Sequence, residues 1–373
     1  MLTSLILSTS IAHPLILAHY MPWYQAPPKS QNYGWHWTMN HFEPEKGQIA
    51  SHFTPSIGPY DSSDPNVIEY QILTMKTAGI DGAIIDWYGT TDTYDYKQLH
   101  ENTTLFISIA EKLNFKFAIC YEDQSIKNSI EQKKVQPDQA QSEFKQTTAT
   151  LKSTWFKSPN YVKLNNEPLL LIFGPQFLTK EQIQPEITGV KTFGVLGNYG
   201  YLTGGFAWPE PQVGHEKSFN QLQNFYTRSK DWNEKIAVAY PRFKDIYKEA
   251  NLHESYGSIE DQGGKTFDQT LDLALKSKSP IIQIATWNDW GEGTQIEPSR
   301  EYQTRDLEKV QTFRKQHLDP TFTARPLDLQ LPYRLLKLRR KDRRPNQLEE
   351  IKNLINSRHF QAAETLLTDL EKD

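Results

Sequence analysis

The sequence is organised around short, almost continuously apolar runs that are bounded by turn residues. Such runs are typical of strands buried on both faces, which occur in parallel sheets covered by helices. Eight of them occur, at residues 14–20, 82–88, 115–121, 168–174, 192–198, 204–208, 236–241 and 281–287. We therefore predict a sheet of buried strands that draws on most of the chain.

Segments between these runs carry the periodicity and the end signals of helices. In one of them Asp64 is a favourable N-cap, Pro65 suits the first turn and Gly79 is a stop signal. Further helical periodicity lies at residues 99–112, 140–156, 219–232, 267–275 and 307–317. Strands that alternate with helices over about 300 residues predict an α/β fold, most economically a (β/α)8 TIM barrel. An open doubly wound sheet is the alternative, but no G-x-G-x-x-G fingerprint follows the first strand, which disfavours dinucleotide binding.

Both ends of the chain differ from the predicted barrel, which we place at residues 14–324. Residues 1–13 contain a short apolar run and a small-x-small end at Ser10 and Ala12, but they lack a basic n-region. We interpret them as a signal or disordered segment. A periplasmic or extracellular location is favoured on this basis, and a cytoplasmic one stays open.

Residues 325–373 predict a C-terminal helical extension, made of a basic segment and a helical hairpin. Leucines interleave with the basic residues between Pro332 and Asn346, so a solvated helix face is favoured over a site for polyanions. The stretch that follows has the apolar spacing of two short amphipathic helices.

Charge and hydropathy exclude several classes of partner. With 41 Lys and Arg against 45 Asp and Glu, the net charge of −4 offers no general attraction for nucleic acid or an anionic membrane. No apolar stretch approaches the ~20 residues that span a bilayer. Cys120 is the only cysteine, so an internal disulfide is impossible, and its apolar neighbours predict a buried strand position.

Polar and aromatic residues gather where the predicted strands end. In barrel enzymes the loops after the carboxyl ends of the strands converge on one mouth, where function is found, and flat rings with polar rims suit sugars. The candidate substrate-binding residues are Tyr20, Trp23, Tyr24, Trp35, His36, Trp37, His41, Asp86, Trp87, Tyr121, Glu122, Tyr199, Trp208, Glu210, Tyr240, Arg242, Trp287, Asn288 and Trp290. For each of them, a structural contact between loops or in the core is the alternative.

No signature of a metal or an organic cofactor accompanies these residues. His36 and His41 lack further ligands at a suitable spacing, and no Gly-x-Ser-x-Gly elbow, P-loop or Cys-x-x-Cys pair occurs. We therefore predict acid–base chemistry without metal or cofactor, carried out by a monomer on a polysaccharide or oligosaccharide.

Asp289 and Glu292 are the strongest candidates for that chemistry. In a helical turn, residues three apart have Cβ atoms roughly 5–6 Å apart, so both carboxyls would lie on one side. Like-charge repulsion and desolvation by Trp287 and Trp290 would raise the pKa of one carboxyl, which could then act as a general acid. The alternative is a capping box, in which Asp289 caps a short helix and Glu292 returns to its amide. Gly291 argues against a good helix there.

The chain resembles glycoside hydrolase family 99, the endo-α-mannosidases and endomannanases, and more loosely the family 71 α-1,3-glucanases. The resemblance rests on residues 21–24, 35–44, 53–89, 165–175 and 286–298. It implies a (β/α)8 barrel that hydrolyses internal α-mannosidic bonds with retention. The family motif Asn-Glu-Trp-His-Glu-Gly-Thr-Gln aligns with residues 288–295, where this chain has Asp289 and Gly291 in place of the first Glu and the His.

By that alignment Glu292 is the general acid/base at the leaving oxygen. Asp289 stands where the family has the carboxylate that deprotonates the 2-hydroxyl of the sugar, and Glu122 aligns with an acid that contacts sugar hydroxyls. We predict a retaining, endo-acting glycoside hydrolase that cleaves α-linked glycans, with α-mannosides first and α-glucans second. A catalytically inactive carbohydrate-binding barrel is one alternative, and a protein that binds a partner through its C-terminal hairpin is another.

Overall fold

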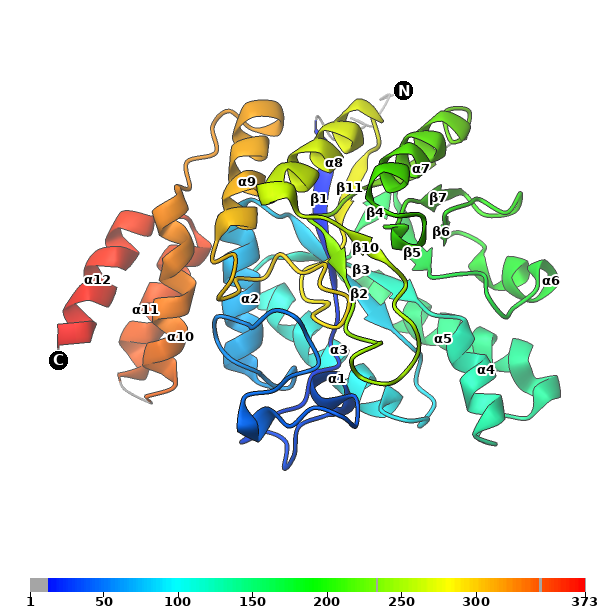
Figure 1. Ribbon diagram of the computed structural model, residues 1–373, viewed down its shortest axis with the longest axis horizontal. Coiled ribbons are helices and arrows are strands. Elements are labelled where there is room, and N and C mark those ends of the chain that lie inside the picture. The colour runs from blue at the N-terminus through cyan, green and yellow to red at the C-terminus, as the bar shows by residue number, and fades with distance from the viewer. Residues whose placement is uncertain (1–12, 233, 342–343, 373) are drawn as a thin grey trace, which may run out of the picture.

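The computed structural model describes residues 13–232, 234–341 and 344–372 (Figure 1). The predicted signal or disordered segment therefore lies almost entirely outside the described residues. Within the described part of the chain, none of the helices combines the length and apolarity needed to cross a bilayer.

A closed β-barrel forms the centre of the molecule. The nine-stranded sheet runs in the order β3-β2-β1-β11-β8-β7-β6-β5-β4, and a pairing between β3 and β5 closes it. Apart from the short β4, which is antiparallel to β5, the neighbouring strands are parallel. The strands are β1 (Leu15–Tyr20), β2 (Gly82–Trp87), β3 (Lys116–Tyr121), β4 (Lys163–Leu164), β5 (Glu167–Ile172), β6 (Lys191–Val195), β7 (Gly204–Phe206), β8 (Glu234–Ala239), β9 (Phe243–Lys244), β10 (Ser258–Ile259) and β11 (Ile281–Ile284). Each predicted apolar run overlaps one barrel strand, so the TIM barrel is confirmed.

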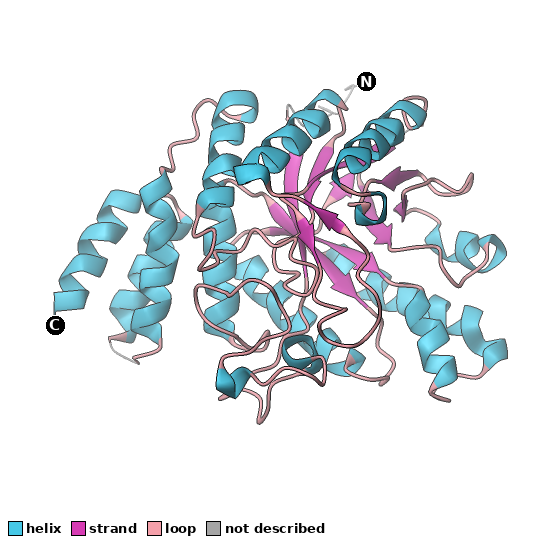
Figure 2. Ribbon diagram, viewed as in Figure 1, coloured by secondary structure: helices cyan, strands magenta, loops and turns pink. Residues whose placement is uncertain are grey.

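Helices surround the strands on the outside (Figure 2). They are α1 (Trp35–Thr38), α2 (Pro65–Ala78), α3 (Tyr96–Lys112), α4 (Gln124–Glu131), α5 (Ala140–Ser153), α6 (Lys180–Ile183), α7 (His215–Arg228), α8 (Lys265–Lys276), α9 (Arg305–Phe313), α10 (Leu331–Arg339), α11 (Pro345–Asn356) and α12 (Phe360–Lys372). The end signals of α2 act as predicted. The Asp64 carboxylate accepts a hydrogen bond from the Asn66 amide, and Gly79 ends the helix in the left-handed region at φ 87°.

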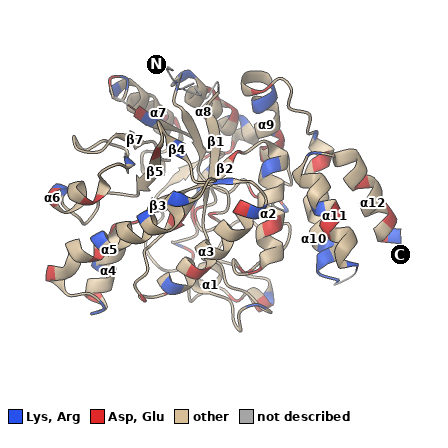
Figure 3. Ribbon diagram, turned by 180° about the vertical axis from the view of Figure 1, so that it is seen from behind, with Lys and Arg blue, Asp and Glu red and all other residues tan. Residues whose placement is uncertain are grey.

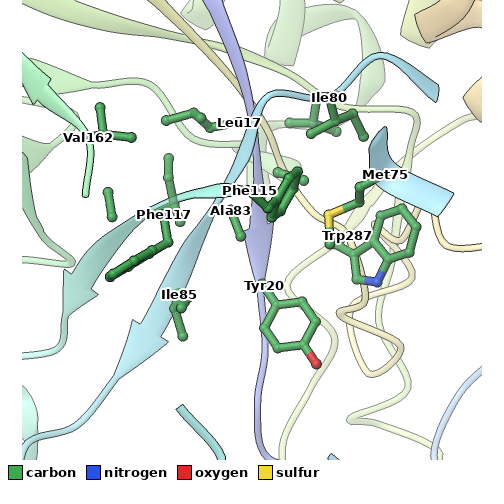
Figure 4. Close-up of a cluster of buried hydrophobic side chains, with 14 of the residues drawn as sticks. Leu17, Tyr20, Met75, Ile80, Ala83, Ile85, Phe115, Phe117, Val162 and Trp287 are labelled. Atoms are coloured by element: carbon green, nitrogen blue, oxygen red, sulfur yellow. The ribbon is translucent and has the colours of Figure 1, made fainter. Parts of the chain in front are cut away.

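The core fills the space between the strands and these helices. Figure 4 shows part of it beside β1, β2 and β3, where Ile85 and Phe117 are fully buried. Trp287, which follows β11, belongs to the same cluster and is fully buried. Its indole is therefore part of the core.

The C-terminal helices pack against one side of the barrel, beside α2. Helix α10 comes from the basic segment, and its Leu335, Leu336 and Leu338 are buried. Its Arg339 donates a hydrogen bond of 2.6 Å to Glu69 of α2 and also pairs with Glu349 of α11. Charges of both signs are spread over α10, α11 and α12 (Figure 3), so the basic residues have acidic neighbours within the protein.

Candidate active site

A small cavity opens among the loops that follow the carboxyl ends of the barrel strands. Its volume is about 180 Å³, and most of its lining consists of aromatic rings. The lining residues are Trp23, Tyr24, Trp35, His36, Met39, Tyr88, Tyr247, Asp289 and Gly291. A larger hollow of about 600 Å³ lies beside α12, but its lining residues Arg325 and Asp328 pair with each other and it contains none of the candidate acids.

The loop after β1 supplies one wall of this cavity. The Trp23 and His36 rings are stacked, with centroids 4.2 Å apart and an angle of 6° between their planes. His36 Nε2 lies 3.4 Å from an oxygen of Asp95, which holds the imidazole in place. Trp35 is 41% exposed, so its indole face is available to a ligand at the rim.

The turn after β11 carries the two predicted catalytic acids. Asp289 lines the cavity, is only 5% exposed, and accepts a 2.9 Å hydrogen bond from the Glu292 amide. The amide of Asp289 donates to the Thr286 hydroxyl at 2.8 Å. Only half of the capping-box alternative is therefore present, and residues 290–293 form a turn in place of a helix. Gly293 has φ 67°, and a Cβ there would lie 2.6 Å from the Lys244 carbonyl oxygen, so the turn requires glycine.

Hydrogen bonds to the loop after β1 hold this turn. Asn288 accepts from the Met21 amide at 2.8 Å and donates to the Met21 carbonyl at 2.9 Å. The Tyr24 hydroxyl donates to the Asn288 carbonyl and accepts from the Trp290 amide. Because these partners are buried, the start of the acid-bearing turn is fixed on both sides of Asp289.

A buried carboxyl supports the turn from behind. Glu297 accepts hydrogen bonds of 2.8 Å from the Tyr60 hydroxyl and from the Gln71 amide, and one of 3.3 Å from the Trp290 indole. Burial raises the pKa of Glu297 to about 7. The Tyr60 hydroxyl also accepts from Asn288, so the same network reaches both sides of Asp289.

The electrostatic setting separates the two acids. Burial raises the pKa of Asp289 to about 6, against the effect of its hydrogen bond from the Glu292 amide. Burial, then repulsion by Asp289 and Asp245, raises the pKa of Glu292 well above its usual range. A proton is therefore retained on Glu292 at a pH where Asp289 is ionised, which is the division of roles that acid–base catalysis requires.

The chain is similar to several known proteins. The sequence pattern of a family described as "Glycosyltransferase WbsX" matches residues 16–191. A glycoprotein endo-α-1,2-mannosidase-like protein of Danio rerio is 24% identical over 77% of this chain and 71% of its own length. The mouse glycoprotein endo-α-1,2-mannosidase is also 24% identical, over 75% of this chain and 67% of its own.

Solved structures show the same likeness. The family 99 endo-α-mannosidase from Bacteroides thetaiotaomicron superposes with a TM-score of 0.63 at 18% identity, covering 82% of this chain and 97% of that one. A structure described as a glycoside hydrolase-like protein gives a TM-score of 0.60 at 15% identity, covering 81% and 94%. The resemblance to glycoside hydrolase family 99 is confirmed.

Several residues of this family 99-like site escape prediction from the sequence. Tyr88 and Tyr247 line the cavity, Asp245 shifts the pKa of Glu292, and His19 shifts the pKa of Asp289. Tyr88 directly follows β2, so its position at a strand end was a usable signal. Tyr247 and Asp245 lie in a loop whose path only the folded barrel defines.

Many predicted substrate-binding residues lie instead within the protein. At most 2% of each is exposed for Tyr20, Trp37, Asp86, Trp87, Tyr121, Tyr240, Arg242, Trp287, Asn288 and Trp290. Arg242 shows why: it forms ion pairs with Asp306 and Asp261 and lies 3.8 Å from the centroid of the Tyr302 ring. Trp37 donates from its indole to the Tyr60 carbonyl at 2.8 Å.

The remaining predicted residues lie around the mouth. Glu122 follows β3, and burial with repulsion by Asp86 raises its pKa well above the usual range. Trp208 packs edge-on against His19, with ring centroids 4.9 Å apart. The others do not line the cavity: His41 and Tyr199 are exposed, and Glu210 is partly buried.

Proposed function

We propose that this chain is a retaining, endo-acting glycoside hydrolase that cleaves α-linked mannosides. The observation that carries the proposal is the pair Asp289 and Glu292 on one rigid turn beside a ring-lined cavity, with pKa values raised to different extents. The relatives named as endo-α-mannosidases support the choice of mannose. At about 180 Å³ the cavity suits a single sugar ring, so the rest of the glycan would extend over the rim at Trp35.

Each acid acts once as a base and once as an acid in the proposed reaction. Asp289 takes the proton from the 2-hydroxyl of the sugar, and O2 attacks the anomeric carbon while Glu292 gives its proton to the leaving oxygen. In the second half, Glu292 takes a proton from water, the water oxygen attacks the anomeric carbon and displaces O2, and Asp289 returns the proton to O2. Two inversions at one carbon give net retention.

Two departures from the family motif bear on the fit of the sugar. Asp289 is one methylene shorter than the Glu of the motif, so the reacting hydroxyl must lie closer to the turn. Gly291 removes the family imidazole, and a Cβ at this position would lie 3.0 Å from the Met39 methyl group. Met39 thus occupies part of the space next to the turn and would set how the sugar is seated.

The family description as a glycosyltransferase raises a different reaction, transfer from a nucleotide sugar. A diphosphate donor requires positive charge on the wall of the cavity that holds it. Among the described lining residues there is no Lys or Arg, and Asp289 is ionised near neutral pH. This setting favours hydrolysis of a neutral glycan.

The test is incubation of the purified protein with yeast α-mannan and, separately, with α-1,3-glucan. We expect oligosaccharides from α-mannan, and the first product detected by proton NMR has the α-configuration at its new reducing end. Release of a monosaccharide alone would contradict endo action, and a first product in the β-configuration would contradict retention. Products from glucan but not from mannan would move the assignment to α-glucans.

The alternative is a barrel that binds glycans without cleaving them, which the shorter Asp289 favours. Calorimetry separates the two cases. A protein that only binds glycans should bind an α-mannan oligosaccharide with the same stoichiometry before and after prolonged incubation. A hydrolase instead yields products during the titration.

A further inference from the structure

Three side chains on adjacent barrel strands bring nitrogen, oxygen and sulfur donors together. His19 lies on β1, Asp86 on β2 and Cys120 on β3, and one ligand atom from each lies within 4.8 Å of the other two. In the sheet register Asp86 pairs with Cys120, and His19 pairs with Ile84, two residues before Asp86. Because side chains two apart on a strand share a face, all three point to the same side of the sheet.

That side is the interior of the barrel. Tyr20, the neighbour of His19 on β1, points the other way and donates from its hydroxyl to Gln71 of α2 at 2.8 Å. The cluster therefore lies inside the barrel near the carboxyl ends of the strands. The cluster is close enough to Asp289 for an electrostatic effect, since His19 and Asp86 both shift the pKa of Asp289.

The donors of this cluster lack partners. His19 Nδ1 and Asp86 Oδ1 are buried and have no hydrogen-bond partner among the described residues. His19 Nε2 is 4.0 Å from Asp86 Oδ1, which is too far for a hydrogen bond, and the two side chains are only 1% and 3% exposed. Buried polar atoms are almost always paired. His19 and Asp86 each carry an unpaired buried atom, and a species bound between the two side chains would supply a partner.

The surroundings of the cluster are rich in carboxyl groups. Glu122 and Asp289 lie close enough to Asp86 for their pKa values to be raised by it. Neither Lys nor Arg is among the main groups acting on these two acids. A divalent cation within the barrel would offset this repulsion.

We propose that His19, Asp86 and Cys120 form a binding site for a divalent transition metal of the Zn²⁺ class. Imidazole, carboxylate and thiolate are the ligand types of zinc, and three protein ligands leave a fourth position for water. Metal–ligand bonds of about 2.0–2.3 Å place tetrahedral ligand atoms roughly 3.3–3.7 Å apart, so small side-chain movements complete the site. Mg²⁺ and Ca²⁺, which prefer oxygen ligands, are disfavoured by the imidazole and the thiolate.

Binding has a defined proton balance. Zinc binds the thiolate form of cysteine, so the Cys120 thiol gives up its proton when the metal binds. Coordination forms a metal–sulfur bond and releases the thiol proton to solvent, so zinc affinity falls as the pH falls. Sequence spacing does not reveal this site, because its ligands are brought together only by strand pairing.

Metal content of the full chain tests the proposal. The protein is stripped of metal with EDTA, incubated with Zn²⁺ and desalted. Its zinc content is then measured by inductively coupled plasma mass spectrometry, and about one zinc per chain is expected. Cys120→Ala and His19→Gln are expected to retain at least about tenfold less zinc. The matched control is His253→Gln, since His253 is exposed and bonds only to the Glu254 carbonyl in its own loop; it should retain zinc like the wild type.

Substitution with Co²⁺ gives a readout on the wild-type protein itself. Wild-type protein should show the near-ultraviolet band of a cobalt–thiolate bond, and Cys120→Ala should lack it. Wild type without zinc and without this band overturns the site, as does a Cys120→Ala variant that binds zinc like the wild type. These measurements use no glycan, so a failure of the metal site is distinguishable from a failure of the proposed hydrolysis.

Discussion

Two tryptophan-rich segments meet at the mouth of the barrel, and they differ in what their indoles do. In the turn after β11, Trp287 and Trp290 are fully buried. In the loop after β1, Trp35 is 41% exposed, and Trp23 lines the cavity with its ring stacked on His36. The tryptophans after β11 thus form a buried frame that supports the turn, whereas those after β1 can contact a ligand.

The difference follows from what each segment carries. The turn holds the acids, and a displacement of about 1 Å can cost on the order of 10²-fold in rate, so its indoles and amides are tied into the core. The loop after β1 faces the space left for a ligand, where an exposed ring gives contact area without a fixed partner. Function therefore depends on a rigid side and an open side of one cavity.

The largest effect is expected on the rigid side, from Glu292→Gln. The amide keeps the size of the side chain but cannot donate the proton to the leaving oxygen, so kcat/KM should fall about 10²–10⁴-fold. Initial rates of oligosaccharide release from α-mannan measure the loss, and circular dichroism should show an unchanged fold.

Glu254→Gln is the matched control for that variant. Glu254 is exposed, and its carboxylate pairs with Lys248 outside the cavity. Its rate should equal that of the wild type. Equal rates for Glu292→Gln and the wild type would remove Glu292 from the reaction.

Trp290→Ala tests the frame itself. Trp290 is fully buried, and its indole donates to the Tyr60 hydroxyl and to Glu297. Removing the ring leaves a cavity and unpaired acceptors, so the free energy of unfolding should fall by about 3–5 kcal/mol in urea titrations. A loss below about 1 kcal/mol would mean that the turn does not depend on this indole.

The sequence was sufficient for the barrel because its signal is local. A strand buried on both faces reads as a continuous apolar run wherever it lies, and β2 (Gly82–Trp87) and β5 (Glu167–Ile172) are examples. Asp289 and Glu292 were accessible for the same reason, since both lie in one short motif. The half-formed cap at Asp289 was also open to prediction, because its spacing is local.

Contacts between distant segments could not be predicted from the sequence. Arg242 follows β8 and reads as a residue of the mouth, but Asp261 and Asp306, far along the chain, draw its guanidinium into the protein. Tyr247 lines the cavity although nothing in its own segment marks it. The sequence thus places a charged or aromatic residue near a strand end, but contacts with distant residues decide where its side chain points.

The pH dependence of the reaction tests whether the buried turn raises the pKa values of Asp289 and Glu292. Asp289 must be ionised to act as a base, and its pKa is raised to about 6 by burial. Below pH ~6, kcat/KM should therefore fall about tenfold per pH unit. At higher pH it should fall again as Glu292, whose pKa is raised well above its usual range, loses its proton.

The free energy of unfolding should also depend on pH through Asp289. Because the folded pKa of Asp289 exceeds the ordinary value of 3.8, folding favours its protonated form. Its contribution is complete below pH ~4 and is lost as the pH rises through about 6. Denaturant midpoints of Asp289→Asn should lack this dependence. An acid limb of kcat/KM centred near pH ~4 would show that burial does not perturb Asp289.

The smallest effect is expected on the open side, from Trp35→Ala. Loss of one ring face should raise KM about fivefold, or about 1 kcal/mol, with kcat unchanged, because a contact made equally to substrate and transition state affects binding alone. Trp35→Phe keeps a ring and should recover most of the affinity. Because Trp35 is 41% exposed, its removal should change the free energy of unfolding by less than about 0.5 kcal/mol. If Trp35→Ala instead destabilised the protein as much as Trp290→Ala, both indoles would belong to the frame, and the ligand would have to be sought against Trp23 and Tyr88, the other rings of the cavity.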